Sequence, residues 1–370
     1  MSEKKRKNHQ NDESYFLASQ WTLMRRKLMK HGLARFSMVL LGLLYCIAIF
    51  GNFVAPSDLV AYNAKTKNCP PTKIHWVHEG DFIGPFVYGL ESERNMETFQ
   101  LEYREDTARI YRIRWFVDGP EYKFWGLFPT TKHLFGVEDD GYLFLFGSDS
   151  MGRDLFSRVI LGSQVSLTIP FVGTVISFVL GVLIGSASGY FGGVVDTVVQ
   201  RIIEVLSSFP SIPLWMALSA AIPSDIPVVR MYLYITIIIS LLSWTKLARI
   251  VRGKFISLRN EDFVTAAKLA GVSDLQIMLK HLVPGFMSYL IVNLTLEIPS
   301  MIIGETSMSF LGLGIRSPAT SWGVLLQEAQ DISSIASYPW RLIPLIAVVV
   351  TVLAFNFLGD GLRDAADPYK

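Results

Sequence analysis

Residues 159–195 carry the sequence VILGSQVSLTIPFVGTVISFVLGVLIGSASGYFGGVV, a run of 37 residues that contains no Asp, Glu, Lys or Arg. The hydrocarbon core of a bilayer takes about 20 residues of helix. This run is therefore long enough for a membrane-spanning helix, which we expect over about 165–190. The pair Gly192-Gly193 marks its end, because glycine is common just after the last turn of a helix. The fold is thus predicted to be that of a membrane protein.

Five further apolar runs lie on either side of this one. They are 36–57, 205–224, 231–245 (extendable back through Ile226), 281–303 across Glu297, and 342–359. The chain is 51% hydrophobic and 18% charged, with a mean hydropathy of +0.35, whereas a soluble domain is about 25% charged. We predict an all-α polytopic membrane protein with six transmembrane helices. The first run is predicted as a retained anchor, since it begins too late for a signal peptide and is too long for a typical buried helix of a soluble protein.

The predicted domain organisation follows from these runs. Its parts are a basic N-terminus over 1–35, a first transmembrane helix over 36–57, an insertion over 58–160, a five-helix transmembrane domain over 161–360, and a C-terminus over 361–370. Nine Lys and Arg lie within 1–35 and seven within 246–280, but only one within 223–230. Cytoplasmic loops carry an excess of Lys and Arg. Both termini are therefore predicted in the cytoplasm, and the insertion outside it.

The insertion over 58–160 is too long for a simple connection between two spans. Within it, residues 109–116 alternate with the period of two that is typical of a strand. We predict a small extracytoplasmic domain of mixed or mostly strand structure. His75 and His78 lie three residues apart in it, but a metal site needs further ligands, so a solvated loop is expected there.

Motifs for catalysis are missing from the sequence. The only Gly-Lys pair, Gly253-Lys254, is followed by Phe255, so the phosphate-binding pattern G-x-x-x-x-G-K-[ST] does not occur, and H-E-x-x-H, C-x-x-C and G-x-S-x-G do not occur either. Cys46 and Cys69 are too few for a disulfide scaffold or a zinc site. The basic residues flank apolar runs, which argues against nucleic-acid binding. We predict a conduit, with no catalytic residue and no metal site.

Three acidic residues lie in or beside apolar runs, where a charge is costly and usually faces water or protein. Glu204 is expected to pair with Arg201. Glu297 precedes Pro299, which lacks an N–H and is expected to bend the helix. Glu305 is followed by small polar residues that suit a helix interface. We predict Glu297, Pro299 and Glu305 as residues of a translocation pathway, with helix packing as the alternative for the two acids.

Residues 260–284 read NEDFVTAAKLAGVSDLQIMLKHLVP and predict two short helices. The first covers about 261–270, with acidic residues at its start and Gly271 just beyond its end. Ser273 then caps the second, about 274–282. One face of the first helix is formed by Phe263, Ala266, Ala267 and Ala270. Small side chains leave room for close approach, so we predict docking into a groove of a partner protein, with a hairpin lying on the membrane as the alternative.

This segment resembles the coupling loop, or EAA motif, of ATP-binding-cassette importer permeases. Thr265-Ala266-Ala267, then Gly271, then Pro284 thirteen residues on follow the family's spacing. Thr265 stands where the family has a glutamate. The resemblance implies a cytoplasmic coupling loop over 252–284 that contacts an ATPase. The implied contact residues are Phe263, Thr265, Ala266, Ala267, Leu269, Ala270, Gly271 and Pro284.

Other segments resemble the dipeptide, oligopeptide and nickel branch of that family. They are 147–154 (GSDSMGRD), 305–314 (ETSMSFLGLG), 321–323 (SWG), 359–364 (GDGLRD) and Asp367-Pro368. The resemblance covers about 145–370, and the first anchor is similar to the N-terminal part of the C-type subunit. The insertion over 58–160 is longer than is common in the family.

The resemblance implies an importer that is assembled from several chains. A second permease subunit completes the pathway, two cytoplasmic ATPase subunits carry ATP and Mg²⁺, and an extracytoplasmic binding protein delivers the cargo. This chain is then not an enzyme, binds no cofactor of its own, and crosses a bacterial or archaeal inner or cell membrane several times. The branch favours peptides as cargo, and oligosaccharides, opine-like conjugates and nickel complexes stay open.

Two other classes of function are weighed against the importer. A membrane-anchored enzyme would use the block over 58–160, but no acid/base or nucleophile set marks it. A ligand sensor would use the same block, but only 361–370 follow the last predicted span, which is too short for an output domain.

Overall fold

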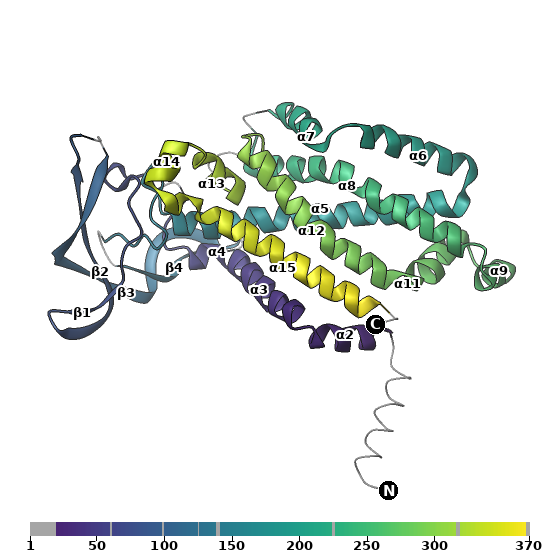
Figure 1. Cartoon of the computed structure of the whole chain (residues 1–370), viewed down its shortest axis with the longest axis horizontal. Coiled ribbons are helices and arrows are strands. Elements are labelled where there is room, and N and C mark those ends of the chain that lie inside the picture. The colour runs from purple at the N-terminus through teal and green to yellow at the C-terminus, as the bar shows by residue number, and fades with distance from the viewer. Residues whose placement is uncertain are drawn as a thin grey trace, which may run out of the picture.

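The computed structural model describes residues 20–59, 61–97, 100–124, 126–137, 141–223, 226–315 and 319–367. The predictions for residues 1–19 and 368–370 therefore lie outside the described residues. Figure 1 shows helices packed side by side along one long axis, with a β-sheet at one end of them.

Five helices in the described part are long and apolar enough to cross a membrane. They are α3 (Gly32–Ile49), α5 (Leu155–Phe191), α8 (Val228–Leu258), α12 (Met287–Phe310) and α15 (Ile343–Ala366), the last preceded by the 3₁₀ turn η3 (Pro339–Leu342). The helices α6 (Gly193–Ser208) and α7 (Ser211–Ala220) pass the same test as a pair. The polytopic helical fold is confirmed, and the predicted six spans are matched when this pair counts as one.

Shorter elements connect the long helices. They are α2 (Gln20–Lys30), α4 (Gly51–Val54), η1 (Ala64–Thr66), α9 (Asp262–Leu269), α10 (Asp274–Gln276), the π-helical η2 (Ile277–Leu282), α11 (Val283–Gly285), α13 (Trp322–Glu328) and α14 (Ile332–Ser337).

The third predicted span, 205–224, is not one straight helix. α6 begins well before it, and α6 and α7 meet at 85°. Phe209 has an extended backbone, with φ −85° and ψ 133°, because the residue before a proline is disfavoured in the helical region. Pro210 thus ends α6. Pro213 lies in the first turn of α7, where a backbone N–H would have no acceptor within the helix, so the N–H that proline lacks costs no hydrogen bond.

The helix α5 is longer than the helix predicted over about 165–190, and α8 is longer than the apolar run that predicts it. Asp154 caps α5 by accepting hydrogen bonds from the N–H groups of Phe156 and Ser157 at 3.2 and 2.9 Å. α8 continues to Leu258, so Lys246 and three further basic residues lie in a helix and not in the predicted loop over 246–280. Hydropathy alone ended this span too early, since it stops at the first charge.

A stripe of small residues brings α5 against α8. Gly181, Gly185 and Gly189 recur every fourth residue on one face of α5. A Cβ atom at Gly185 would lie 2.5 Å from the carbonyl oxygen of Ala248 on α8, and one at Gly189 would lie 2.7 Å from that of Arg252. The two backbones therefore touch, as they do at small-residue interfaces in membranes.

The insertion folds into one antiparallel sheet. Its strands are β1 (His75–His78), β2 (Asp81–Arg94), β3 (Leu101–Phe124) and β4 (Phe128–Val137), in the order β1-β2-β3-β4. The strand predicted at 109–116 is confirmed as part of β3. The solvated loop predicted at His75 and His78 is wrong, because both residues lie in β1, where the ring of His75 is near the rings of Phe86 and Tyr88.

Two segments fasten the sheet to the helices. Residues 63–72 and 142–154 run beside each other, and Cys69 and Ser148 hold them together. The N–H of Ser148 donates to the Cys69 carbonyl at 2.8 Å, and the N–H of Cys69 donates to the Ser148 hydroxyl at 2.7 Å. Gly147 has φ +75°, and a Cβ there would lie 2.7 Å from the Cys69 carbonyl oxygen. Backbone hydrogen bonds hold this junction together, and the Tyr103 hydroxyl of β3 donates to its Lys67 carbonyl at 2.6 Å.

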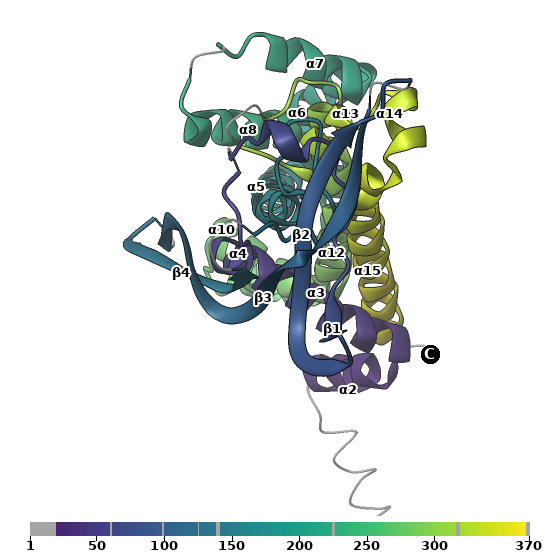
Figure 2. The same ribbon diagram turned by 90° about the vertical axis from the view of Figure 1, so that its left-hand side faces the viewer.

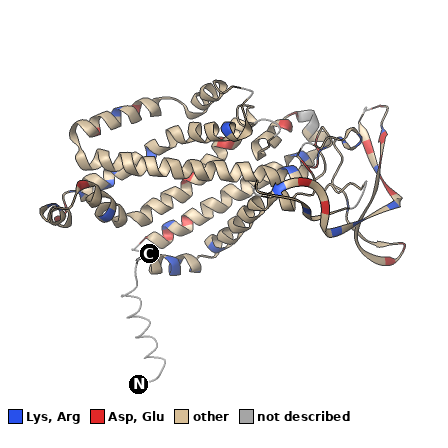
Figure 3. Ribbon diagram, turned by 180° about the vertical axis from the view of Figure 1, so that it is seen from behind, with Lys and Arg blue, Asp and Glu red and all other residues tan. Residues whose placement is uncertain are grey.

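The sheet and α9 lie at opposite ends of the helical body (Figure 1). Seen from the sheet end, the strands pass in front of the ends of the helices (Figure 2). Charged residues gather on the sheet and toward the ends of the helices, and they are sparse along the middle (Figure 3). This distribution fits a body whose middle lies in a bilayer.

The backbone contact between α5 and α8 yields a prediction with a control in the same helix pair. Gly185→Ala places a methyl group against the α8 backbone, and we expect a loss of about 1–3 kcal/mol of stability from overpacking. A Cβ atom added at Gly253 would have no neighbouring atom within 4 Å. Gly253→Ala also removes a glycine from a helix interior, so this variant should be neutral or stabilising. Thermal unfolding of both purified variants compares them, and equal melting temperatures would contradict the proposed close contact.

Candidate functional site

The α9 hairpin, residues 261–285, comprises α9, α10, η2 and α11 and lies at the end of the helical body opposite the sheet (Figure 1). Glu261 is the N-cap residue of α9, and Asp262 begins its first turn. Carboxylates at this end of a helix interact favourably with the helix dipole. The first predicted helix, about 261–270, is confirmed.

Gly271 ends α9 in a left-handed conformation, with φ +75°. Its N–H donates to the Lys268 carbonyl at 3.0 Å, and the N–H of Val272 donates to the Ala267 carbonyl at 3.1 Å. These two bonds form a Schellman motif, in which glycine avoids the strain that a side chain would cause. The predicted place of Gly271 after the helix is confirmed.

The second predicted helix, about 274–282, is present in two parts. α10 is a single turn, and η2 continues it with π-helical bonds to Leu282. Ser273 stands at the N-cap position, but its side chain makes no cap hydrogen bond. The cap bond that the sequence predicted at Ser273 is therefore wrong.

Val264 fixes α9 to the rest of the protein. Its side chain has no exposed surface and lies in a buried cluster with Phe255 of α8, Ile277 and Leu282 of η2, and Leu290 of α12. Complete burial of a valine is worth about 1.5–3 kcal/mol. α9 is thus seated on the ends of two long helices and does not hang free.

Polar contacts also hold the α9 hairpin against the end of α5. The Tyr190 hydroxyl at the end of α5 donates to the Asp274 carboxylate at 2.6 Å, and the Lys268 ammonium lies 5.1 Å from the centre of the Tyr190 ring. The Arg259 guanidinium donates to the Gly189 carbonyl at 3.1 Å. Side chains before and after α9 thus contact the end of α5.

The outer surface of the α9 hairpin carries most of the predicted contact residues. Exposed there are Phe263, Thr265, Ala266, Leu269, Ala270, Gly271 and Pro284, with Leu269 85% and Phe263 47% exposed. Ala267 differs, because it is half-buried and packs against the cluster around Val264. The face that four residues were expected to share is therefore made by Phe263, Ala266 and Ala270.

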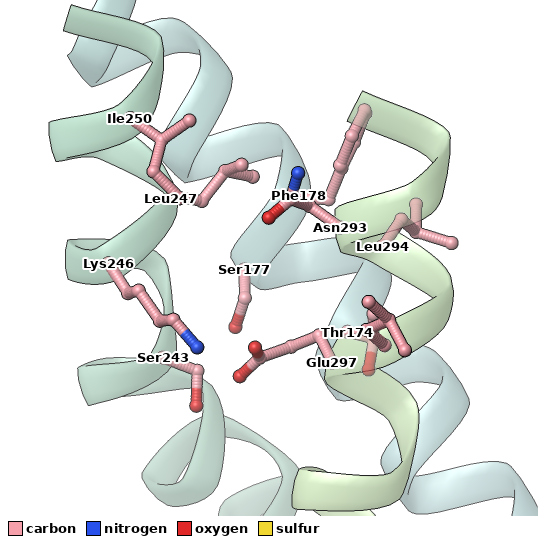
Figure 4. Close-up of a pocket in the computed structure, with 11 residues that line it drawn as sticks. Thr174, Ser177, Phe178, Ser243, Lys246, Leu247, Ile250, Asn293, Leu294 and Glu297 are labelled. Atoms are coloured by element: carbon pink, nitrogen blue, oxygen red, sulfur yellow. The ribbon is translucent and has the colours of Figure 1, made fainter. Parts of the chain in front are cut away.

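A second candidate site is a pocket of about 110 Å³ between α5, α8 and α12. Figure 4 shows Lys246 of α8 and Glu297 of α12 directed into it from opposite walls, with Ser177 and Ser243 beside them. Ionisable groups at mid-span are costly and usually mark functional positions. The structure therefore keeps Glu297 as a pathway candidate, in a half-buried position.

Lys246 lines this pocket, although the sequence predicts it as one of the charges of a cytoplasmic loop. It lies well inside α8 and is exposed on that helix. The run 231–245 has only 15 residues before it, fewer than the roughly 20 that a span needs. That shortfall was the signal that the helix continues past the lysine.

The other two predicted pathway residues are buried. Pro299 lies buried within a continuous α12. Glu305 has no exposed surface and accepts hydrogen bonds from the hydroxyls of Ser309 and Ser166 at 2.7 and 3.2 Å. It joins α12 to α5, as the packing alternative predicts.

The pair predicted on α6 is confirmed. Arg201 Nη1 lies 2.8 Å from Glu204 Oε2, and both side chains are exposed. An exposed pair of this kind contributes at most about 1 kcal/mol, so it serves below as a control and not as a site.

A buried charge network lies at the end of the bundle opposite the α9 hairpin. Arg158 near the start of α5 donates to Asp149 at 2.6 Å and to Glu328 of α13 at 2.9 Å, and Arg153 donates to the same two carboxylates at 2.7 and 3.0 Å. Removing one member of a buried pair leaves an uncompensated charge. The network thus fixes α13 on the beginning of α5. It was not predicted, because Glu328 is remote in sequence.

No cluster of three or more His, Cys, Asp or Glu side chains is placed to hold a metal ion within the described ranges. His75 interacts instead with Glu105, at 3.2 Å.

Comparisons with known proteins agree with this architecture. The family described as "Binding-protein-dependent transport system inner membrane component" matches residues 177–369, and the "N-terminal TM domain of oligopeptide transport permease C" matches 19–71. The chain is 42% identical over 230 residues to the oligopeptide transport system permease protein OppC of Haemophilus influenzae. These residues cover 62% of this chain and 71% of that protein.

Two further relatives are similar to this chain. The glutathione transport system permease protein GsiD of an Escherichia coli strain is 42% identical over 240 residues, covering 65% of this chain and 73% of that one. The dipeptide transport system permease protein DppC of Bacillus subtilis is 29% identical over 344 residues, covering 93% and 84%.

The seat of α9 yields a prediction about its local stability. Val264→Ala removes buried methyl groups, which should lower the opening free energy of α9 by roughly 1–2 kcal/mol. The amides of 262–269 should then exchange hydrogen about five to thirty times faster. Leu269→Ala, on an 85% exposed residue, is the matched control and should leave exchange unchanged. Equal exchange in both variants would mean that Val264 does not hold the helix.

Proposed function

Because this chain belongs to the family of binding-protein-dependent transport system inner membrane components, we propose that it is the C-type permease subunit of an ATP-driven importer of peptides. The observation that carries the proposal is the α9 hairpin, a capped helix that is firmly seated on α5 and α8 and presents a small-residue face outward. Such a face fits a groove on a partner protein.

The α9 hairpin is proposed as the element that couples this chain to its ATPases. Phe263 and Leu269 offer exposed apolar surface, and Ala266 and Ala270 allow close approach between them. Movement of an ATPase would pass through Val264 into the ends of the long helices. ATP shifts the inward–outward equilibrium only to the extent that the ATPase contacts the two states unequally.

The proposed orientation places the sheet outside and α9 in the cytoplasm. Lys27 of α2 donates to the Asp367 carbonyl at 2.9 Å, so both ends of the described chain lie on one side. An even number of crossings is needed for this, which supports counting α6 and α7 as one span. The basic residues of α2 then lie in the cytoplasm, in line with the positive-inside rule.

The proposed complex contains a second permease subunit, two ATPase subunits that carry ATP and Mg²⁺, and an extracytoplasmic binding protein. This chain forms one side of the pathway and itself binds no cofactor in the proposal. Peptides are proposed as cargo because the relatives are named for oligopeptides, dipeptides and glutathione. Of the predicted pathway residues, Glu297 is retained, since it lines a pocket.

The sheet is proposed to receive the loaded binding protein. It lies at the outer end of the helices in the proposed orientation and exposes large aromatic side chains, among them Phe82 (73%), Trp115 (66%) and Trp76 (53%). Aromatic residues are enriched at protein interfaces, so this surface supports a docking role.

The coupling role predicts that a bulky charge on the outer face of α9 separates ATP hydrolysis from transport. Ala266→Arg changes an exposed residue and should leave the chain folded in the membrane while peptide uptake falls at least about tenfold, as expected when a docking contact is lost. Thr197→Arg is the control, at an exposed position on α6. Uptake by reconstituted importer is the measurement, and normal uptake with Ala266→Arg would exclude the coupling assignment.

The receiving role predicts that the strands are dispensable for assembly. Residues 75–137 can be replaced by a short linker while the junction of 63–72 with 142–154 is kept. We expect the importer to assemble and to hydrolyse ATP at its basal rate, but to lose stimulation by the binding protein, because the docking surface is gone. ATPase rates with and without binding protein test this, and undiminished stimulation would show that the sheet has another role.

A further inference from the structure

The pocket between α5, α8 and α12 holds two ionisable groups of opposite charge that face each other without a hydrogen bond between them. Lys246 and Glu297 point toward one another across it (Figure 4). Within the described ranges, neither side chain makes a hydrogen bond or a direct ion pair. If the only role of this carboxylate and this ammonium were to pair with each other across the helices, we would expect them in contact, because charge-assisted hydrogen bonds are short.

The other polar groups of the pocket are free to accept hydrogen bonds. Thr174 is 2% exposed, and its hydroxyl oxygen has no hydrogen-bond partner in the described part of the chain. Ser177 and Ser243 donate their protons to backbone carbonyls of α8, at 3.2 and 3.1 Å, which leaves their oxygen lone pairs for another donor. A carboxylate with nearby hydroxyl oxygens matches a group that is positively charged and carries several N–H donors.

We propose that this pocket binds the α-ammonium group of a peptide at Glu297, and that the Lys246 ammonium, which faces Glu297 across the pocket when no peptide is bound, withdraws as the peptide ammonium enters. The proposal rests on the proposed function, because it identifies the part of the cargo that this chain recognises. Lys246 is suited to the role, since its flexible stem lets the charge enter the pocket or leave it.

The size of the pocket sets how much of a peptide it holds. A volume of about 110 Å³ admits one charged end group, whereas sites for whole drug-sized ligands measure about 300–1,000 Å³. A larger cavity of about 1140 Å³ lies next to it, between α12 and the end of α15, and the two share Asn293 and Leu296 as lining residues. In this proposal the remainder of the peptide extends toward that cavity while its ammonium is held at Glu297.

A labelling experiment tests the charge preference without any partner protein. The full chain is placed in lipid nanodiscs with Cys46→Ala and Ser243→Cys. Cys69 stays unreactive, because it is buried and burial raises the pKa of its thiol to about 12. The rate of modification by 2-aminoethyl methanethiosulfonate, which carries an ammonium, is divided by that of the anionic 2-sulfonatoethyl reagent.

The expected result is that Lys246→Gln raises this ratio and that Glu297→Gln lowers it about tenfold, the effect of one hydrogen bond to a charged group. Glu204→Gln, on the exposed pair of α6, should leave it unchanged. A ratio that does not respond to Glu297→Gln overturns the proposal, and so does an introduced thiol in the Ser243→Cys variant that neither reagent reaches.

A transport experiment then separates this proposal from the proposed function. Reconstituted importer is given matched peptides with a free or an acetylated N-terminus, and uptake by the Glu297→Gln variant is divided by wild-type uptake for each. We expect this quotient to fall about tenfold for the free amine only. Equal quotients for both peptides overturn the ammonium site while leaving the importer intact. If the wild-type complex takes up no peptide, the proposed function fails, and the labelling ratio still decides the site.

Discussion

The direct backbone contact between α5 and α8 is the constraint on which the rest of the structure depends. In a bilayer, lipid tails are as apolar as leucine, so helices gain from close packing more than from burial of apolar surface. Gly181, Gly185 and Gly189 permit this packing because any Cβ atom at these positions would meet α8 within 3 Å. Ser177 continues the same face and donates to the Ser240 carbonyl at 3.2 Å. The two longest helices thus form one rigid unit.

Both candidate sites are built on this unit. At one end, Tyr190 of α5 and Phe255 of α8 hold the α9 hairpin through a hydrogen bond and a buried apolar contact. Farther along the same pair, Thr174 and Lys246 line the pocket that α12 closes with Glu297. Because the backbones of α5 and α8 are in contact, sliding of α5 along α8 is hindered. In the proposed coupling, a displacement at α9 instead changes how this pair packs on α12, the helix that carries Glu297.

The sequence predicts the features that depend on local chemistry. Apolar runs locate the spans, and the acidic start and Gly271 define α9, because dipole and backbone strain act within a few residues. Features that depend on neighbours from other helices were missed. Glu297 and Glu305 are both acids of α12, yet Ser166 of α5 donates a hydrogen bond to the second, whereas the first makes none with a described residue and faces Lys246. Lys246 was misplaced for a similar reason, since hydropathy records a charge but not the cavity that it faces.

The contrast between the two acids bears on how transport is driven. A fully hydrogen-bonded acid such as Glu305 holds helices together, whereas an acid at mid-span without a partner is tolerated only if water, a ligand or another charge compensates it. Glu297 and Lys246 lie on α12 and α8, so the space between them depends on how these helices pack. If the ammonium site is tighter in one packing, then whatever shifts the packing through α9 shifts cargo affinity. By linkage, cargo binding then changes the affinity for the ATPase-closed state by the same factor.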